Sequence, residues 1–192
     1  RGLGMCIRDR LTNARKELDT GRSAWNLAMG SQALYDWLDA EPDIFHPGDL
    51  DYIHSVERIS RLSNVISING GVQLDLMGQE NAESAGTRQL SGIGGQMDFL
   101  EGAYRSKGGK GFICINASHV TKDGERKSNI VAAIPSGSTI SAPRTMIQYV
   151  ATEYGIAELS GKSLRERAEA MAAIAHPDFR EELLKYAKEN FR

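Results

Sequence analysis

Hydrophobic positions along the chain follow two different periods, and each period predicts one kind of element. Short runs that alternate between apolar and polar residues, or that are almost wholly apolar, are typical of β-strands. Such runs occur at 24–30, 65–70, 72–78, 111–117 and 129–135, with two shorter ones at 138–141 and 149–155. The runs at 111–117 and 129–135 contain few polar residues, so we expect central strands that are buried on both faces.

Apolar residues three and four positions apart predict helices. These lie at 31–40, 54–63, 96–106, 163–175 and 176–191. Ser31 is expected to cap the first helix, Ser163 and Glu166 form a capping box, and Pro177 stands at a first-turn position. Because strands and helices alternate, the predicted fold class is α/β, with an open, mixed and largely parallel sheet flanked by helices.

Composition limits the classes of function. The chain has 192 residues, of which 41% are hydrophobic and 25% charged, and its formal net charge is −2. This balance is typical of one soluble globular domain, and the lack of a basic patch argues against a nucleic-acid partner. No apolar stretch approaches the length of a membrane span, and residues 1–12 lack the apolar core of a signal peptide. We therefore expect a cytoplasmic protein with neither a membrane nor a nucleic-acid partner.

Cysteine and histidine positions give no metal signature. Cys6 and Cys114 have no metal-ligand spacing, and neither has any pair of the four histidines, so no metal site is expected. Cys114 stands in the apolar run "FICINA" and is predicted to be a buried thiol. Two such thiols fit a reducing compartment.

Glycine is the one unusual feature of the composition. The chain has 20 glycines in 192 residues, against a usual share of about 7%, and most of the excess lies between Gly70 and Gly111. In "SGIGGQMDF", residues 91–99, Gly92, Gly94 and Gly95 stand directly before a predicted helix. Such a turn permits positive φ, and the helix start offers free N–H groups to an anion or a developing oxyanion. The alternative is a tight turn that only packs closely.

Two further polar turns could contact a ligand. "SKGGKG" at 106–111 carries Lys107 and Lys110, which could meet phosphates, although on this string alone a solvated turn is the simpler interpretation. "GQENAES" at 78–84 follows a predicted strand and carries Glu80 and Glu83. Ligands often contact strand ends in open α/β sheets, but for each carboxylate alone a solvated polar loop is the simpler interpretation.

Three strings together point to one protein family. "SINGGVQLDLMGQENAES", "SGIGGQMDFLEGAYRSKGGKGFI" and "YVATEYGIAELSGKSLRERAEAMAAIAHPDFREEL" resemble the C-terminal domain of the acetyl-CoA hydrolase and 4-hydroxybutyrate CoA-transferase family. The resemblance runs from about residue 20 to the end of the chain. It implies a CoA-transferase-like α/β fold over residues 23–192. It also implies transfer of coenzyme A between an acyl-CoA of the acetyl, butyryl or 4-hydroxybutyryl type and a short carboxylic acid, through a glutamyl-CoA intermediate.

The resemblance also implies which residues contact the substrate. The glycine turn would lie against the thioester of an acyl-CoA, which is a substrate, so no resident cofactor is expected. The residues implied to contact coenzyme A are Asn69, Gly70, Gly71, Gly92, Gly94, Gly95, Gln96, Lys107 and Lys110. The family further implies an N-terminal domain of the same polypeptide, which forms much of the CoA pocket, and a homo-oligomer.

One departure from the family pattern concerns the nucleophile. Family members carry a nucleophilic glutamate in an "H-[ST]-E" segment after a "GLG-[MI]"-like string, whereas here "RGLGM" is followed by "CIRDRLTNARKELDTG". We therefore expect no catalytic nucleophile in this chain, and a remnant or aberrant segment at 1–22. Glu80, Glu83 and Glu101 match no nucleophile position of the family. His54 stands where relatives often carry Asn near the substrate. Two alternatives remain open: an acyl-CoA hydrolase, or a non-catalytic module that binds CoA or a nucleotide.

Overall fold

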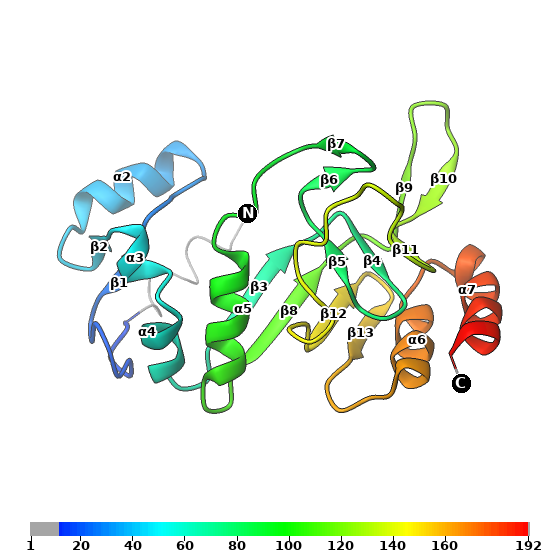
Figure 1. Ribbon diagram of the computed structural model, residues 1–192. Helices are drawn as coiled ribbons and strands as arrows, with labels where there is room; N and C mark the ends of the chain where they lie inside the picture. The colour runs from blue at the N-terminus through cyan, green and yellow to red at the C-terminus, as the bar shows by residue number, and fades with distance from the viewer. Residues whose placement is uncertain (1–11, 192) are drawn as a thin grey trace.

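The computed structural model describes residues 12–191 (Figure 1). The first part of the chain forms β1 (Ser23–Trp25), α2 (Gln32–Ala40), β2 (Phe45–Pro47), α3 (Leu50–Ile53) and α4 (Val56–Arg61). The middle part forms β3 (Ile66–Gly70), β4 (Gln73–Asp75), β5 (Glu80–Asn81), β6 (Ser84–Ala85), β7 (Arg88–Gln89), α5 (Gln96–Arg105) and β8 (Lys110–Cys114). The last part forms β9 (Ser118–Val120), β10 (Arg126–Ser128), β11 (Ile130–Val131), β12 (Tyr149–Thr152), β13 (Gly155–Glu158), α6 (Leu164–Ala173) and α7 (Pro177–Asn190).

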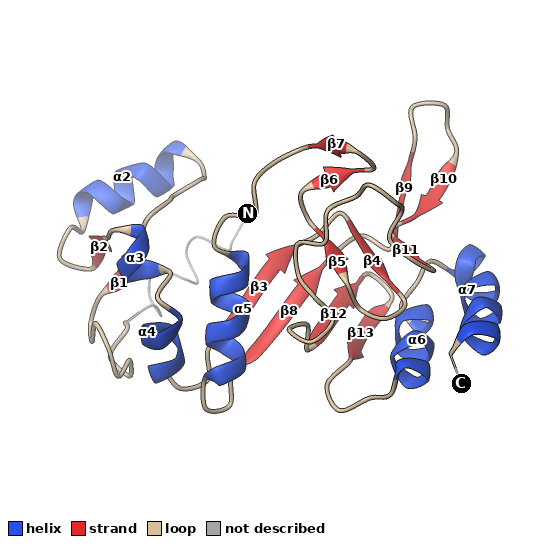
Figure 2. Ribbon diagram, viewed as in Figure 1, coloured by secondary structure: helices blue, strands red, loops and turns tan. Residues whose placement is uncertain are grey.

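The main sheet has four strands in the order β13-β12-β8-β3 (Figure 2). Strands β3, β8 and β12 are parallel, and β13 returns antiparallel to β12. A smaller sheet has the order β11-β4-β5. Helix α5 packs on β3 and β8, α4 packs on α5, and α6 packs on β13. The predicted α/β class, with a mixed, largely parallel sheet and flanking helices, is therefore confirmed.

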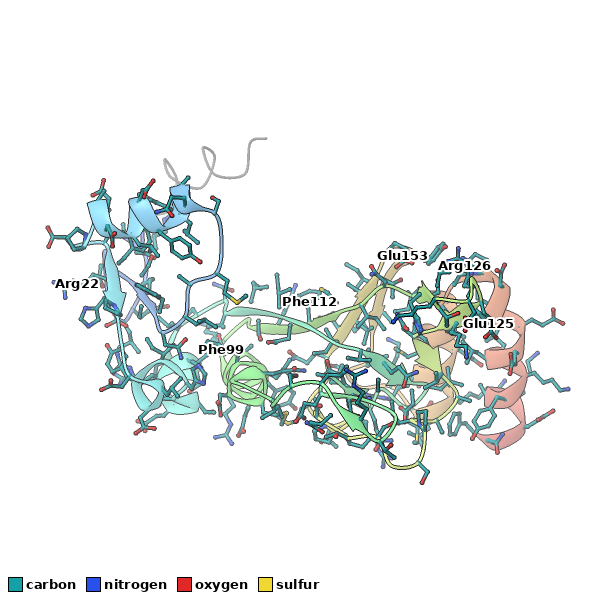
Figure 3. All side chains as sticks on the ribbon, turned by 90° about the horizontal axis from the view of Figure 1, so that it is seen from above. Arg22, Phe99, Phe112, Glu125, Arg126 and Glu153 are labelled. Atoms are coloured by element: carbon teal, nitrogen blue, oxygen red, sulfur yellow. The ribbon has the colours of Figure 1, made fainter. Side chains whose placement is uncertain are left out.

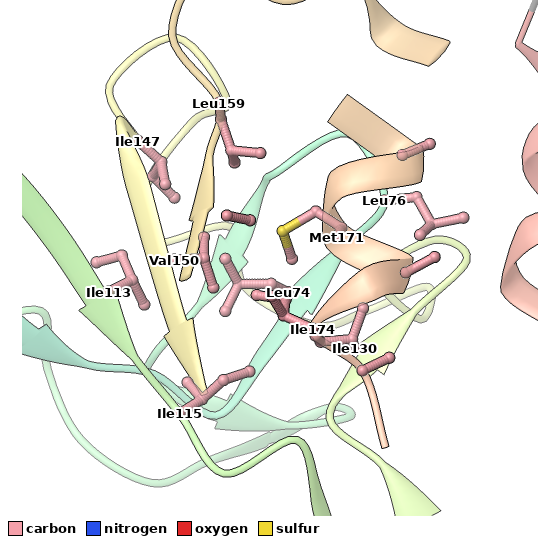
Figure 4. Close-up of a cluster of buried hydrophobic side chains, with 14 of the residues drawn as sticks. Leu74, Leu76, Ile113, Ile115, Ile130, Ile147, Val150, Leu159, Met171 and Ile174 are labelled. Carbon is pink, nitrogen blue, oxygen red and sulfur yellow. The ribbon is translucent and has the colours of Figure 1, made fainter. Parts of the chain in front are cut away.

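The hydrophobic core joins the two sheets to α6 (Figure 4). Strands of the smaller and the main sheet and the helix each contribute fully buried side chains, among them Leu74, Ile130, Ile113, Val150 and Met171. Full burial of an aliphatic side chain stabilises a fold by ~1.5–3 kcal/mol. This cluster therefore stabilises the packing of β4, β8 and β12 against α6.

The other face of the main sheet is open among residues 12–191. Cross-strand pairing places Ile68, Phe112 and Tyr149 on this face, and Ile68 is 68% exposed. Figure 3 shows Phe112 on the side of the sheet away from α5. The prediction that 111–117 is buried on both faces is therefore wrong. The buried thiol at Cys114 is wrong for the same reason, because alternate residues of β8 point toward the open face and Cys114 is exposed.

Several helix predictions are confirmed at their ends. Helix α5 begins at Gln96 and ends at Arg105. The capping box of α6 is present, with the Ser163 hydroxyl accepting from the backbone N–H of Glu166, and Pro177 opens α7. Ser31 does precede α2, but its side chain makes no capping hydrogen bond. None of the helices within residues 12–191 is both long enough and apolar enough to cross a membrane.

Several predicted strands are shorter than expected or absent, among them 72–78, which contributes only the three residues of β4. The run 24–30 contributes only β1, and 129–135 contributes only the two residues of β11. At 138–141 no strand forms, and the adjacent Ala142 makes a single bridge to Glu80 instead. Apolar content predicts burial at these positions, whereas strand length depends on a partner, and β11 pairs with only two residues of β4.

The segment that precedes β1 is described from residue 12 and consists of turns. It packs against the first helices: the Asp19 carboxylate accepts a hydrogen bond from the Tyr52 hydroxyl at 2.5 Å and lies 3.6 Å from the Arg58 guanidinium. Glu17 accepts from the backbone N–H of Ser63 at 3.2 Å. Residues 1–11, with Cys6 and half of the expected aberrant segment, lie outside the described residues. A domain boundary after residue 22 therefore stays a prediction.

Candidate functional site

The glycine turn ends in an uncapped helix start. Gly94 has φ +58°, a conformation that favours glycine, and Gly95 stands at the N-cap of α5 with no side-chain capping hydrogen bond. The first backbone bond of the helix runs from the Phe99 N–H to the Gly95 carbonyl. The N–H groups before Phe99 thus keep no intrahelical partner and lie at the positive end of the helix dipole. This arrangement suits a negative or strongly polarised oxygen.

The two glycines of the turn serve different purposes. No described atom lies within 4 Å of a Cβ built on Gly94, so that position is open, whereas a Cβ on Gly95 would overlap the imidazole of His54. His54 is held by the Asn26 side chain at 3.0 Å, by Asp98 at 3.4 Å, and by edge contact with the Phe99 ring. Gly95 is therefore explained by close packing against His54. Gly94 lies in open space, which is compatible with the approach of a ligand.

A buried glutamate lies directly behind the turn. Glu80 is 0% exposed, and its Oε2 accepts a hydrogen bond from the side-chain amide of Gln96, the first residue of α5. Its Oε1 has no hydrogen-bond partner among the described residues. Burial raises the pKa of Glu80 to about 8, and the hydrogen bond from Gln96 opposes this rise. The solvated-loop interpretation of "GQENAES" is therefore wrong for Glu80.

The end of β3 meets the glycine turn through this carboxyl group. A Cβ on Gly71 would lie 2.7 Å from Glu80 Oε1, and Gln96 binds the other oxygen, so Gly71, Glu80 and Gln96 form one contiguous group. Asn69 is the penultimate residue of β3, and its side-chain amide donates to the Ser67 hydroxyl at 2.9 Å. Of the predicted contact residues, the structure thus brings together 69–71 and 94–96, at the carboxyl ends of parallel strands.

The predicted lysines lie at the opposite end of α5. Lys107 follows the C-terminus of this ten-residue helix, which is about 15 Å long, and Gly94 precedes its N-terminus. Lys110 pairs with Ile66 at the start of β3, whereas Gly70 ends that strand. Both lysines are exposed. The structure therefore does not join them to the glycine turn, and their role in CoA contact stays a prediction.

A hollow lies beside the strand end. It has a volume of about 700 Å³, and its lining includes Gly71, Asn116, His119, Lys127 and Asn129. The His119 and Asn129 side chains contact each other at 2.7 Å. Apart from Gly71, these residues were not predicted from the sequence. Within residues 12–191, no group of three or more His, Cys, Asp or Glu side chains is arranged to hold a metal ion.

Comparison with known proteins decides the family. A profile of the acetyl-CoA hydrolase/transferase C-terminal domain matches residues 30–187. The chain belongs to this family. Among curated relatives, the butyryl-CoA:acetate CoA-transferase of Anaerostipes caccae is 42% identical over 179 residues, which are 93% of this chain and 40% of the relative. The resemblance predicted from the three sequence strings is thereby confirmed.

Solved structures of the family agree with this fold. RipA from Yersinia pestis superposes with a TM-score of 0.85 at 41% identity, covering 98% of this chain and 42% of that protein. A 4-hydroxybutyrate CoA-transferase from Porphyromonas gingivalis superposes with a TM-score of 0.79 at 35% identity, covering 99% of this chain and 43% of that protein. The acetyl-CoA hydrolase/transferase domain described here therefore spans about two fifths of the length of these relatives.

Proposed function

We propose that this chain is the CoA-contacting C-terminal half of a CoA-transferase. The parent protein would move coenzyme A between an acyl-CoA of the acetyl, butyryl or 4-hydroxybutyryl type and a short carboxylic acid, in the cytoplasm. The observation that carries the proposal is the 42% identity to a butyryl-CoA:acetate CoA-transferase across 93% of the chain. The parent would also contain an N-terminal domain and assemble as a homo-oligomer.

The glycine turn supports a role beside the thioester. In acyl transfer, the carbonyl oxygen gains negative charge as the nucleophile attacks, and preorganised N–H groups stabilise that charge. The open Gly94 leaves room for the acyl group, and the uncapped start of α5 supplies such N–H groups. Coenzyme A is elongated, with the thioester at one end and the phosphates at the other. Contacts by Lys107 and Lys110 at the far end of α5 therefore suit the same ligand.

The chain alone is expected to have no transferase activity. The family mechanism needs a glutamate that holds the acyl group and then coenzyme A while the acids exchange, and no "H-[ST]-E" occurs in these 192 residues. The three glutamates considered in the sequence are engaged elsewhere: Glu80 is buried, Glu83 accepts from Ser141 at 2.6 Å, and Glu101 pairs with Arg105. After incubation with acetyl-CoA and butyrate, mass spectrometry should detect no butyryl-CoA above a heat-treated control.

A full-length CoA-transferase assayed under the same conditions is the positive control. If this chain formed butyryl-CoA, and if the product disappeared in Glu80→Gln, Glu83→Gln or Glu101→Gln, the nucleophile would lie among those residues and its assignment to an "H-[ST]-E" segment would be wrong. Release of free CoA from acetyl-CoA without butyrate would instead favour the hydrolase alternative, which the name of the family includes.

Gly94→Val is expected to weaken the binding of acetyl-CoA by about tenfold, which corresponds to ~1.4 kcal/mol. A branched side chain would occupy the open space beside the turn, and valine strongly disfavours φ +58°. Titration of the chain with acetyl-CoA, followed by calorimetry, measures the effect. Gly161→Val is the matched control, because Gly161 also has positive φ, +71°, and an open surround, but lies in the loop before α6. Equal affinity in the two variants would remove Gly94 from the binding site.

A further inference from the structure

Glu80 has an unusually constrained position for an acidic residue. Its backbone N–H donates to the Ala142 carbonyl at 3.0 Å, and its own carbonyl accepts from the Ser141 N–H at 2.8 Å. Its side chain is 0% exposed. The backbone is thus fixed on both sides of the residue, and the carboxyl group cannot reach solvent without a shift of this segment.

Gly71 lies between the free oxygen of this carboxyl and two apolar side chains. A Cβ built on Gly71 would lie 2.7 Å from Glu80 Oε1, and the same point is 3.1 Å and 3.3 Å from methyl groups of Ile115 and Ile113. Any side chain at position 71 would therefore displace the carboxyl. The absence of a Cβ at Gly71 allows the end of β3 to lie directly against Glu80.

The second oxygen connects the same carboxyl to the glycine turn. It accepts from the side-chain amide of Gln96, which is 8% exposed. Gln96 is the first residue of α5 and follows Gly94 and Gly95 directly. Because the hydrogen bond fixes the side chain of Gln96, it also fixes the start of the helix and the direction in which the turn presents its N–H groups.

We infer that Glu80 is a positioning residue that holds the glycine turn and the end of β3 in register, through Gln96 on one oxygen and Gly71 on the other. It would not touch the reacting atoms. Its consequence for ligand binding rests on the proposed function, whereas its effect on the turn does not.

The protonation state of Glu80 should then control the turn. With a pKa of about 8, set by burial, the carboxyl keeps its proton at neutral pH and needs no charge partner. Ionisation at higher pH would place an uncompensated charge in an apolar site and draw water to Oε1. Water at this position would move Gly71 away from the carboxyl and shift the turn relative to β3.

No neighbouring charge compensates the ionised form. The packed elements do carry charged groups, namely Asp75 on β4, Asp98 on α5, Lys110 on β8 and Arg144 in the loop after Ala142. Among residues 12–191, no ion pair or hydrogen bond joins any of them to Glu80. The Asp75 carboxylate is instead engaged by the side-chain amide of Gln79 at 2.7 Å.

The test follows backbone and side-chain amide signals of the ¹⁵N-labelled chain between pH 6 and pH 10. The signals of Gly71, Gly95 and the Gln96 side chain should shift together, with one midpoint near pH 8. In Glu80→Gln, which keeps an oxygen to accept from Gln96, all three shifts should disappear. In the matched control Glu83→Gln, which changes a half-buried neighbour on the same segment, they should persist. Both variants and the reference chain are made in a His54→Asn background, which removes the imidazole beside Gly95 from all three proteins.

Three outcomes would overturn the inference: no shared midpoint between pH 7 and pH 9, shared shifts that persist in Glu80→Gln, or shifts that disappear in Glu83→Gln. If Glu80→Gln does not fold, the ¹³C signal of the Glu80 carboxyl in the unmodified chain is followed instead, and a titration midpoint below pH 6 refutes the role.

The binding of acetyl-CoA is measured as a separate experiment. Its affinity should fall severalfold from pH 7 to pH 9 in the unmodified chain and stay constant in Glu80→Gln. If neither protein binds acetyl-CoA, the proposed function fails, whereas the shared titration still decides the role of Glu80.

Discussion

Replacing Arg167 with methionine is expected to lower the free energy of unfolding by about 3–5 kcal/mol, because each buried acceptor left unpaired costs about 1–3 kcal/mol. Arg167 lies on α6, is 8% exposed, and donates three hydrogen bonds to backbone carbonyls: Nε to Met77 at 2.7 Å, Nη1 to Leu159 at 2.9 Å, and Nη2 to Arg144 at 2.7 Å. Methionine has a similar length but no donor, so three carbonyls that are now paired would lose their partner.

The guanidinium owes its position to these carbonyls more than to any carboxylate. Burial lowers the pKa of Arg167 below its usual value, the nearby charge of Arg144 lowers it further, and Asp75 opposes this by raising it. A cation held by carbonyl oxygens at this depth joins α6 to the turn after β4 and to the loop after β13. Loss of this junction would loosen the segment that leads into Glu80.

Arg165→Met is the matched control for this prediction. Arg165 lies on the same helix, is exposed, and forms only an i,i+4 pair with Glu169 at 3.0 Å. Such a pair contributes about 0.3–0.5 kcal/mol, so this variant should unfold at nearly the denaturant concentration of the unmodified chain. Urea unfolding, followed by circular dichroism, measures both variants. Equal losses of stability in Arg165→Met and Arg167→Met would show that the three carbonyl contacts are unimportant.

The sequence predicts the local parts of this fold well. These local parts are helix α5, the capping box of α6 and Pro177 at the start of α7. Each depends on residues within a few positions of one another, so it can be recognised in the sequence without knowledge of tertiary contacts. The positive φ at Gly94 follows in the same way from a glycine cluster before an amphipathic run.

Burial on the sheet could not be predicted in the same way. An apolar run such as 111–117 shows that a strand is there, but whether its second face is covered depends on elements outside the strand. In this chain Phe112 is only half buried and Cys114 is exposed, because the second face of the main sheet is open among residues 12–191. The number of residues in β11 likewise depends on how far β4 extends.

The candidate site could be predicted from the sequence only in part, for the same reason. The glycine turn and the end of β3 were each identified from their own residues, but their proximity depends on Glu80, which pairs with Ala142 in a distant loop. A polar string such as "GQENAES" is solvated in most proteins, and nothing within it signals full burial of one carboxylate. Lys107 and Lys110 were predicted to contact the same ligand as the glycine turn, yet they lie at the other end of α5. A glycine-lysine turn has a similar sequence at either end of a helix, so the sequence alone could not place them.

Glu80→Gln is expected to remove a strong pH dependence from the stability of the domain. The carboxyl has a pKa of about 8 in the folded chain and 4.5 as the ordinary value for the unfolded chain. Below pH 4.5 both states carry the proton, and the residue contributes no pH dependence. Between pH 4.5 and 8 only the unfolded chain loses the proton, so stability falls as pH rises, by up to ~1.4 kcal/mol per pH unit. Above pH 8 both states are ionised and the loss levels off, at about 3–5 kcal/mol in total.

Glutamine carries no titrating proton, so its unfolding free energy should lack this decline. Relative to the unmodified chain, Glu80→Gln should differ by a constant offset near pH 4.5 and should gain about 3–5 kcal/mol beyond that offset by pH 9. Urea unfolding at each pH measures the difference, and all other titrating groups cancel because both proteins share them. Glu83→Gln should run parallel to the unmodified chain over the same range. Parallel curves for Glu80→Gln as well would mean that Glu80 is already ionised in the folded protein, in which case water must reach a carboxyl that is 0% exposed.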